Sequence, residues 1–206
     1  MRLWLIKCSS GSHLSISDDP DHPYLWSSSL KDTTFGDSQS SLSYTKEEAE
    51  KILKGLNTER DVRIVELGVD EPIDESTADA VGGILVTRLC ERLETLGYTM
   101  HTTESFTCGR ASMFNQSRGQ SSAPCHWIHS VNSCSIHIWF EAKSAASLGM
   151  FYKPSTNFQL VIGAYQSRDV DLPTLELPVP EGCIPEDWAA AKVVERLNAI
   201  AGAKED

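Results

Sequence analysis

One long apolar stripe constrains the fold of this 206-residue chain more than any other pattern. Apolar residues recur at helical spacing through residues 77–96 and are followed directly by Gly97, a residue that easily adopts the left-handed conformation that ends a helix. A stripe of this width has to be covered by another element. The pattern predicts a packed helix over residues 77–96, capped by residues 76–79. The stripe consists of Ala80, Val81, Ile84, Leu85, Leu89, Leu93 and Leu96.

Shorter patterns place the remaining elements. The sequence Thr45-Lys-Glu-Glu48 has the form of a capping box and predicts a helix over residues 46–56, and a final helix is expected over residues 186–201. These elements predict an α+β fold, an antiparallel sheet with helices packed on one face, in which a small β-β-α-β unit precedes an α-β-β-β-β-α unit. Strands are expected at residues 2–7, 24–28, 62–67, 98–106, 133–141, 148–152 and 158–165.

A charged, proline-containing joint at residues 70–74 is the expected domain boundary. It divides the chain into an N-terminal unit of residues 1–70 and a C-terminal domain of residues 71–206. The second part contains a long central loop, residues 107–132, for which no helical or strand period is visible.

The charge balance excludes some partners. With 18 basic and 29 acidic residues the net charge is -11, which disfavours direct nucleic-acid binding and adsorption to an anionic membrane. No apolar run is long enough to span a bilayer, and no leader-like segment is visible. Six irregularly spaced cysteines are typical of reduced thiols, so a cytoplasmic location is expected. The acidic residues cluster near positions 18–21, 70–79 and 181–187, which leaves a DNA-mimic inhibitor as one hypothesis.

Chemistry-bearing residues concentrate in residues 98–142, which hold four of the six histidines and three of the six cysteines. Strand alternation places His101 and Thr103 on the polar face of the first strand, and His137, Trp139 and Glu141 on the polar face of the second. If the two strands are neighbours in the sheet, the two histidines are expected on one polar face. His101-Thr102-Thr103 has the His-x-Thr form that two-histidine phosphoesterases carry twice, but His137 lacks the second hydroxyl, so no family resemblance follows. These three residues are the catalytic candidates for a phosphoester hydrolase, and two histidines on a solvated sheet face are the simpler alternative.

Metal binding is a separate hypothesis. Cys125 and His129 form the best available pair of zinc ligands, although the chain contains no Cys-x-x-Cys or His-x-x-x-His pair. The ordinary alternative is that they are loop residues. The sequence points to no particular cofactor.

The central loop mixes recognition residues with flexible serine and glycine, and long loops of this kind are usually functional or disordered. We therefore expect a non-catalytic cytosolic accessory protein, an effector or a phage-type factor of viral origin, that binds another protein or a small ligand such as a nucleotide. The hydrolase and the DNA mimic are its alternatives. The expected contact residues are Arg110, Phe114, Arg118 and Trp127 in the loop and Trp139 on the adjacent polar strand face.

Overall fold

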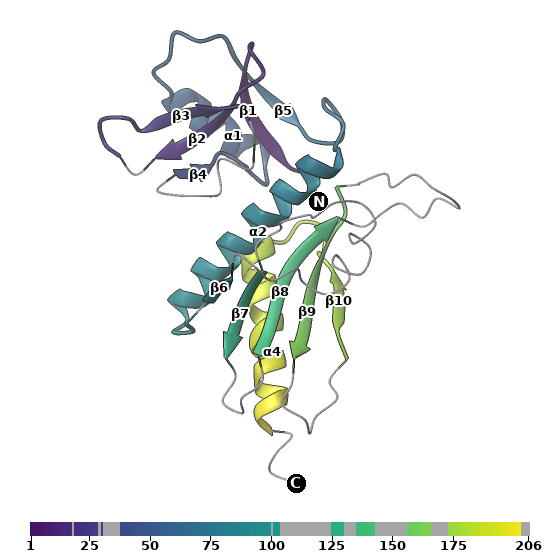
Figure 1. Cartoon of the computed structure of the whole chain (residues 1–206). Coiled ribbons are helices and arrows are strands. Elements are labelled where there is room, and N and C mark those ends of the chain that lie inside the picture. Colours follow the sequence, from purple (N-terminus) through teal and green to yellow (C-terminus); the bar gives the residue numbers. More distant parts are fainter. Residues whose placement is uncertain are drawn as a thin grey trace. The chain divides into compact units, whose positions relative to one another are not determined.

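The computed structural model describes residues 1–17, 19–28, 30, 38–99, 101–103, 125–129, 135–142, 156–165 and 173–202. The chain forms two compact units, and each combines an antiparallel sheet with helix, which confirms the predicted α+β class (Figure 1). Unit 1 consists of Met1–Ile84 with Lys143–Thr156, and unit 2 consists of Leu85–Ala142 with Asn157–Asp206. The division falls inside a helix, between Ile84 and Leu85, whereas the sequence places a boundary at residue 70.

Unit 1 contains a five-stranded antiparallel sheet with the order β3-β2-β1-β5, and β4 pairs with β2. The strands β2 and β4 are not among the strands expected from the sequence. Their local sequence is rich in serine, and only pairing with neighbouring strands makes them part of a sheet. The elements are β1 (Trp4–Cys8), β2 (His13–Ser17), β3 (Tyr24–Ser27), β4 (Ser38–Ser40), α1 (Lys46–Gly55) and β5 (Val62–Glu66).

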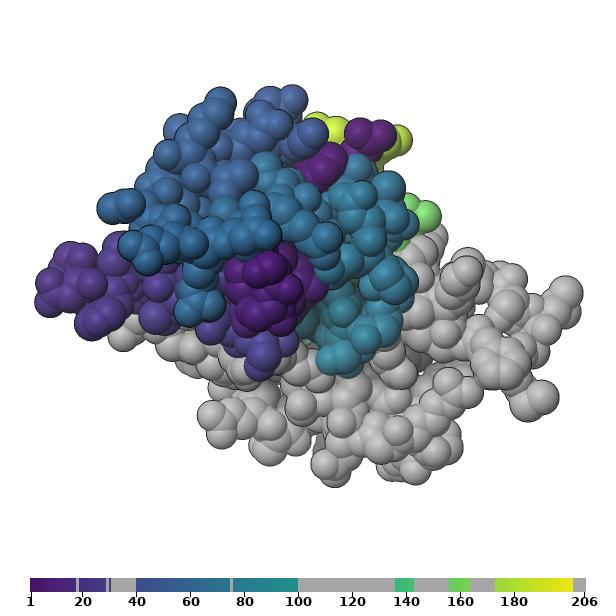
Figure 2. Space-filling view, turned by 90° about the horizontal axis from the view of Figure 1, so that it is seen from above, coloured from purple at the N-terminus to yellow at the C-terminus, as the bar shows by residue number. Residues whose placement is uncertain are grey.

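The helix α1 begins with the predicted capping box. The Thr45 hydroxyl accepts from the Glu48 backbone N–H at 3.2 Å, and the Glu48 carboxylate accepts from the Thr45 N–H at 3.2 Å. The helix covers the face of the sheet that carries Trp4 and Tyr24, because the Tyr24 hydroxyl donates to the Gly55 carbonyl at 3.3 Å and Lys46 Nζ lies 6.0 Å from the centroid of the Trp4 ring. Figure 2 shows the described purple and blue segments of this unit in one continuous surface.

Unit 2 contains a second five-stranded antiparallel sheet, with the order β10-β9-β8-β7-β6. In Figure 1, α4 runs along one face of this sheet. The second half of α2 lies beside α4, because Arg92 Nε and Asp187 Oδ1 are 2.7 Å apart. The elements are α2 (Glu75–Thr95), β6 (His101–Thr103), β7 (Cys125–His129), β8 (Ser135–Ala142), β9 (Phe158–Tyr165), β10 (Leu175–Pro178) and α4 (Pro185–Gly202).

The core of unit 2 follows from alternation along β8 and β9. Ile138 pairs with Ile162 and Phe140 with Leu160, so the two central strands present one continuous apolar face. All four residues are buried, as are the apolar residues of the two helices. The buried helix residues include Leu85, Leu89 and Leu93 of α2 and Ala189, Ala190 and Val193 of α4.

Three expectations for this part of the chain need correction. The loop 107–132 was predicted to lack secondary structure, which is wrong for residues 125–129, because β7 is hydrogen-bonded on both sides, by β6 and by β8. No strand is expected after residue 165, whereas Leu175–Pro178 form the strand β10. The helix α2 begins at Glu75, and its first turn is capped by Asp74, whose carboxylate accepts from the Thr77 N–H at 2.7 Å. The strand expected at 148–152 lies outside the described residues.

Candidate functional site

The register of the second sheet brings the predicted site positions together. His101 pairs with Trp127, and Trp127 pairs with His137, so these three positions form one row across β6, β7 and β8. The same alternation includes the other predicted positions that the structure describes. Because alternate positions of a strand belong to one face, we call this set the polar face of unit 2. It consists of His101, Thr103, Cys125, Trp127, His129, Ser135, His137, Trp139, Glu141, Gln159, Val161 and Gly163.

The centre of this polar face is buried. His137 is 7% exposed, Gln159 is 6% exposed and Val161 is 2% exposed, although the apolar face that packs with the helices is on the other side of the same strands. Burial lowers the pKa of His137, because a low-dielectric environment disfavours the charged imidazolium. The polar face that alternation along β8 defines is therefore only partly accessible to solvent.

A carboxylate is held by two donors on this face. Gln159 Nε2 donates to Glu141 Oε1 at 2.5 Å, across the β8–β9 pair, and Trp139 Nε1 donates to Glu141 Oε2 at 3.4 Å. The sequence reasoning did not select Glu141 or Gln159 as site residues. The sequence nevertheless contains a feature that indicates each residue. Alternation along β8 puts Glu141 on the same face as Trp139, and Gln159 is the one amide in an otherwise apolar run.

The two candidate catalytic histidine positions are separated by one strand. Strands in a sheet are about 4.8 Å apart, so the backbones of His101 and His137 lie roughly 10 Å apart, with Trp127 in the row between them. Catalysis by His101, Thr103 and His137 stays a prediction.

The geometry of β7 does not favour the proposed metal pair. Cys125 and His129 occupy the two ends of a five-residue strand, and four steps of about 3.3 Å separate their backbones by roughly 13 Å. Zinc lies about 2.0–2.3 Å from each ligand atom, and a cysteine and a histidine together do not span the remaining distance. In the part of the chain that the structure describes, no three His, Cys, Asp or Glu residues gather around a common point.

The loop residues Arg110, Phe114 and Arg118 lie outside the described residues. Of the five expected contact residues, Trp127 and Trp139 are the two whose positions the structure gives, on neighbouring strands of the polar face. Trp139 pairs with Val161, and its side chain is half-buried.

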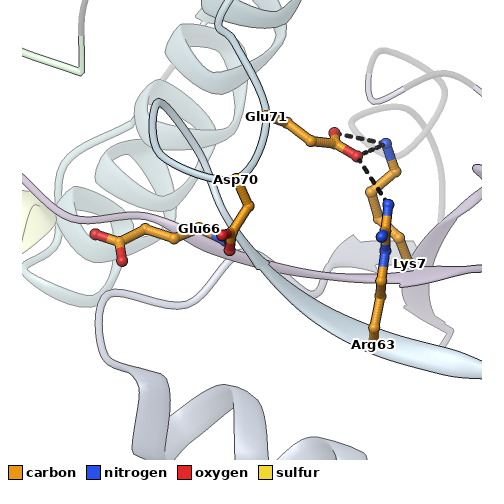
Figure 3. Close-up of polar contacts among 5 residues, drawn as sticks. All are labelled: Lys7, Arg63, Glu66, Asp70 and Glu71. Atoms are coloured by element: carbon orange, nitrogen blue, oxygen red, sulfur yellow. Dashed lines mark hydrogen bonds and ion pairs between the residues drawn. The ribbon is translucent and has the colours of Figure 1, made fainter.

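A second polar cluster lies in unit 1 (Figure 3). Lys7 Nζ contacts both carboxylate oxygens of Glu71, at 2.7 and 2.8 Å, and Arg63 Nη2 lies 3.7 Å from Glu71 Oε1. The neighbouring Asp70 carboxylate accepts from the Glu66 N–H at 2.8 Å. These acidic groups hold the turn between β5 and α2 in place, so they are engaged inside the unit.

A thiol that the sequence reasoning did not select stands at the end of β1. The Ser10 hydroxyl, 2.9 Å from Cys8 Sγ, lowers the pKa of the Cys8 thiol to about 7, and burial opposes this shift. Cys8 is only 3% exposed. A thiolate that solvent hardly reaches is a poor nucleophile toward a large substrate.

No protein-family model matches the chain, and no curated protein or solved structure matches it either. None of the helices in the described ranges is long and apolar enough to cross a lipid bilayer.

Proposed function

We propose that this protein is a non-catalytic binding protein whose contact surface is the partly exposed part of the polar face of unit 2, around Trp139 and Glu141. The observation that supports this proposal is the register of β6, β7 and β8, which places His101, Trp127 and His137 in one row of that face. Beside this row, Trp139, Glu141 and Gln159 form a hydrogen-bonded group.

The chemistry of the face suits recognition. An aromatic ring offers a large rigid surface, and a carboxylate and an amide fix the orientation of a bound group. A half-buried tryptophan beside polar groups is typical of a residue that dominates binding energy. The face would therefore accept a peptide segment or a small molecule that has both an apolar surface and hydrogen-bonding groups.

The proposed role also implies a cellular location. We place the protein in the cytoplasm, which is supported by free thiols at Cys8, Cys90 and Cys183 among the described residues. An acidic chain of this kind would act as an effector or as a phage-type factor that occupies another molecule.

The test compares four forms of the full chain: wild type, Trp139→Leu, Glu141→Gln and the control Glu91→Gln, which alters an exposed carboxylate of α2. Melting temperatures are measured with a panel of nucleotides and cyclic nucleotides, and the same forms are used in a pull-down. We expect a ligand that raises the melting temperature of wild type and of Glu91→Gln, but not of the two variants of the polar face, or a partner protein retained in the same pattern. A ligand or partner that all four forms bind equally would exclude this face.

A second candidate, phosphoester hydrolysis, is supported by the shared row of His101 and His137. Incubation with cyclic nucleotides separates the two functions. Turnover that disappears in both His101→Ala and His137→Ala would replace the binding proposal, whereas binding without turnover would support it.

The DNA-mimic alternative has less support. In the second of its three acidic clusters, Glu71 forms an ion pair with Lys7, Asp70 accepts a hydrogen bond in a turn, and Asp74 caps a helix. In the third cluster, Asp187 forms an ion pair with Arg92. A mimic would need these carboxylates to face outward at the spacing of phosphates.

A further inference from the structure

The outer edge of β3 in unit 1 is the feature that leads furthest beyond the proposed function. The strand β3 ends the sheet order and pairs with β2 alone. The Ser17 N–H donates to the Pro23 carbonyl at 3.0 Å, so residues 17 and 23 are a hydrogen-bonded pair. Hydrogen-bonded and non-hydrogen-bonded pairs alternate along an antiparallel ladder. The N–H and C=O groups of Leu25 therefore point toward Ser15 of β2, whereas the N–H and C=O groups of Tyr24 and Trp26 make no hydrogen bond to β2.

A second bond agrees with this assignment. The Leu14 carbonyl accepts from the Ser41 N–H at 3.2 Å, on the side of β2 that faces away from β3. Leu14 is the partner of Trp26, and both residues of a non-hydrogen-bonded pair direct their backbone groups away from each other. The N–H and C=O groups of Tyr24 and Trp26 thus point outward from the sheet, and no residue in the described ranges bonds to them.

The side chains along this edge are uncharged and partly apolar. Leu25 is 43% exposed, although it is a large aliphatic residue. Tyr24 and Trp26 lie on the opposite face, where the Tyr24 hydroxyl bonds to Gly55 and the Arg60 guanidinium lies 5.5 Å from the Trp26 ring centroid. A lysine or a proline within the strand is one of the features that prevent pairing at an exposed edge, and residues 24–27 contain neither, although the strand is short.

We propose that a second copy of this chain pairs with β3 in an antiparallel manner, about a twofold axis at Leu25. In that register Tyr24 lies opposite Trp26 of the second copy, and the outward groups of each pair exchange two hydrogen bonds. The twofold axis also places Trp26 opposite Tyr24 of the second copy, and this pair makes the same two hydrogen bonds. Every outward N–H and C=O group of these two residues therefore has a partner. The edge is self-complementary, which is the requirement for a closed twofold interface.

The same register brings the two exposed leucines together. Leu25 would face Leu25 of the second copy in a non-hydrogen-bonded pair, where the two Cα atoms lie about 4.5 Å apart and the side chains are in contact. Both side chains would lose the exposure that they have in the single chain. A strand of a different protein would have to supply its own matching pattern, whereas the second copy already carries it.

The expected dimer is weak. A four-residue edge buries far less than the roughly 1,200 Å² of a stable interface, and each chain carries a net charge of -11. The repulsion between the two chains is screened by salt, so dimerisation should increase with both protein concentration and ionic strength.

The first experiment is sedimentation equilibrium of the full chain over a concentration series at low and high salt. Wild type is compared with Leu25→Lys, which places two like charges at the axis, and with the matched control Val69→Lys. Val69 is 73% exposed, belongs to the same unit and undergoes the same change of charge. We expect a wild-type dimer whose dissociation constant rises at least about tenfold in Leu25→Lys and is the same in Val69→Lys as in wild type.

A cross-linking experiment tests the register without disturbing the edge. Leu25→Cys would place two thiols at a Cα separation of about 4.5 Å, within the range that a disulfide bridges. After mild oxidation we expect a covalent dimer of Leu25→Cys that exceeds the amount formed by wild type and by Val69→Cys. A wild-type chain that stays monomeric at every concentration and salt, an unchanged dimer in Leu25→Lys, or no excess cross-linking of Leu25→Cys would overturn the proposal.

Discussion

Lys7 brings a charged side chain into the interior of unit 1, and Glu71 compensates its charge. The exposed fraction is 11% for the Lys7 side chain and 26% for that of Glu71, so water reaches neither group freely. Removing one partner of such a pair leaves the other charge buried without compensation, which costs more than the pair itself contributes.

We predict that Glu71→Ala lowers the free energy of unfolding by about 2–3 kcal/mol, less than the roughly 3–5 kcal/mol of a fully buried pair because Glu71 is partly exposed. The double variant Lys7→Met/Glu71→Leu should recover most of this loss, since no unpaired charge remains. Urea unfolding measures both. Lys192→Met is the control, because Lys192 forms an exposed ion pair with Glu195 of the kind that contributes little. A loss in Glu71→Ala as small as the control's would contradict the prediction.

A half-buried histidine, His13, and a buried one, His137, make stability depend on pH. Burial lowers the pKa of both His13 and His137 below the usual 6.5, and the charge of Lys7 lowers that of His13 further, while Glu71 opposes this shift. As the pH falls through 6.5, the unfolded chain takes up protons that the folded chain does not. The unfolded state then binds more protons, so the free energy of unfolding decreases with decreasing pH.

The measurement is the free energy of unfolding between about pH 7.5 and 5.5, above the range in which ordinary carboxylates titrate. We expect wild type to lose stability across this window and His137→Gln to lose less, because one of the two titrating groups is absent. The variant need not be as stable as wild type, since only the slope is compared. Equal slopes in the two proteins would show that His137 does not contribute.

At the scale of the element, the end of α2 shows how a local signal becomes a structure. Gly97 has a φ of +90°, its N–H bonds to the Glu94 carbonyl at 2.9 Å, and the Tyr98 N–H bonds to the Leu93 carbonyl at 3.1 Å. These bonds satisfy carbonyl groups that a helix end leaves open. A residue with a side chain is strained at this φ, even though nothing lies within 4 Å of the place where its Cβ would be.

Two glycine variants separate backbone strain from contact. Gly97→Ala should lower stability by about 1–2 kcal/mol, the cost of the left-handed conformation. Gly55→Ala, at the last residue of α1, also meets nothing within 4 Å and has no positive φ, so it should be neutral or stabilising by up to about 1 kcal/mol. Thermal unfolding of the two variants and wild type tests the pair. A loss in Gly55→Ala equal to that in Gly97→Ala would refute the explanation from φ.

The elements that could be predicted are those whose signals are local. The capping box at Thr45, the stop at Gly97 and the apolar run of β9 each act within a few residues, and each is confirmed. The strands β2, β4, β7 and β10 were not predicted, because they are short and contain serine, histidine or proline. Their partners, not their own sequences, make them strands.

The candidate site was predictable to a similar degree. Alternation correctly grouped His137 with Trp139 and Glu141 on one face of β8. It could not show that the bond from Gln159 holds Glu141, because that contact depends on the register of two strands far apart in the chain. Nor could it show that His137 is buried, since burial of a polar face depends on what packs over it.

At the scale of the whole molecule, unit 1 needs more of the chain than its sheet. Residues after position 70 contribute buried side chains to it, and the unit includes the first half of α2. A fragment that ends at residue 70 would lack four buried side chains that belong to this unit. They are Ile73 at 8% exposure, Ala78 at 5%, Val81 at 0% and Ile84 at 4%.

We therefore predict that a fragment of residues 1–70 does not unfold cooperatively. Far-ultraviolet circular dichroism during heating is the measurement, with the full chain as the reference. The expected result is a broad, shallow change in the fragment and a sigmoidal transition in the full chain. A sharp transition in the fragment within a few degrees of the full chain would show that the sheet and α1 suffice.

The position of Thr156 in the chain affects the order in which the parts of unit 1 are synthesised. Its Cγ2 atom lies 2.7 Å from where a Cβ on Gly68 would be, so a residue made late in translation packs against a turn made early. The first stretch of unit 1 ends at Ile84, and residue 156 follows 156 − 84 = 72 residues later. At about 5–20 residues per second a ribosome needs roughly 4–14 s to make them. During that interval the nascent N-terminal sheet, with the uncharged edge of β3, is present without the segment that contributes Thr156 to the unit.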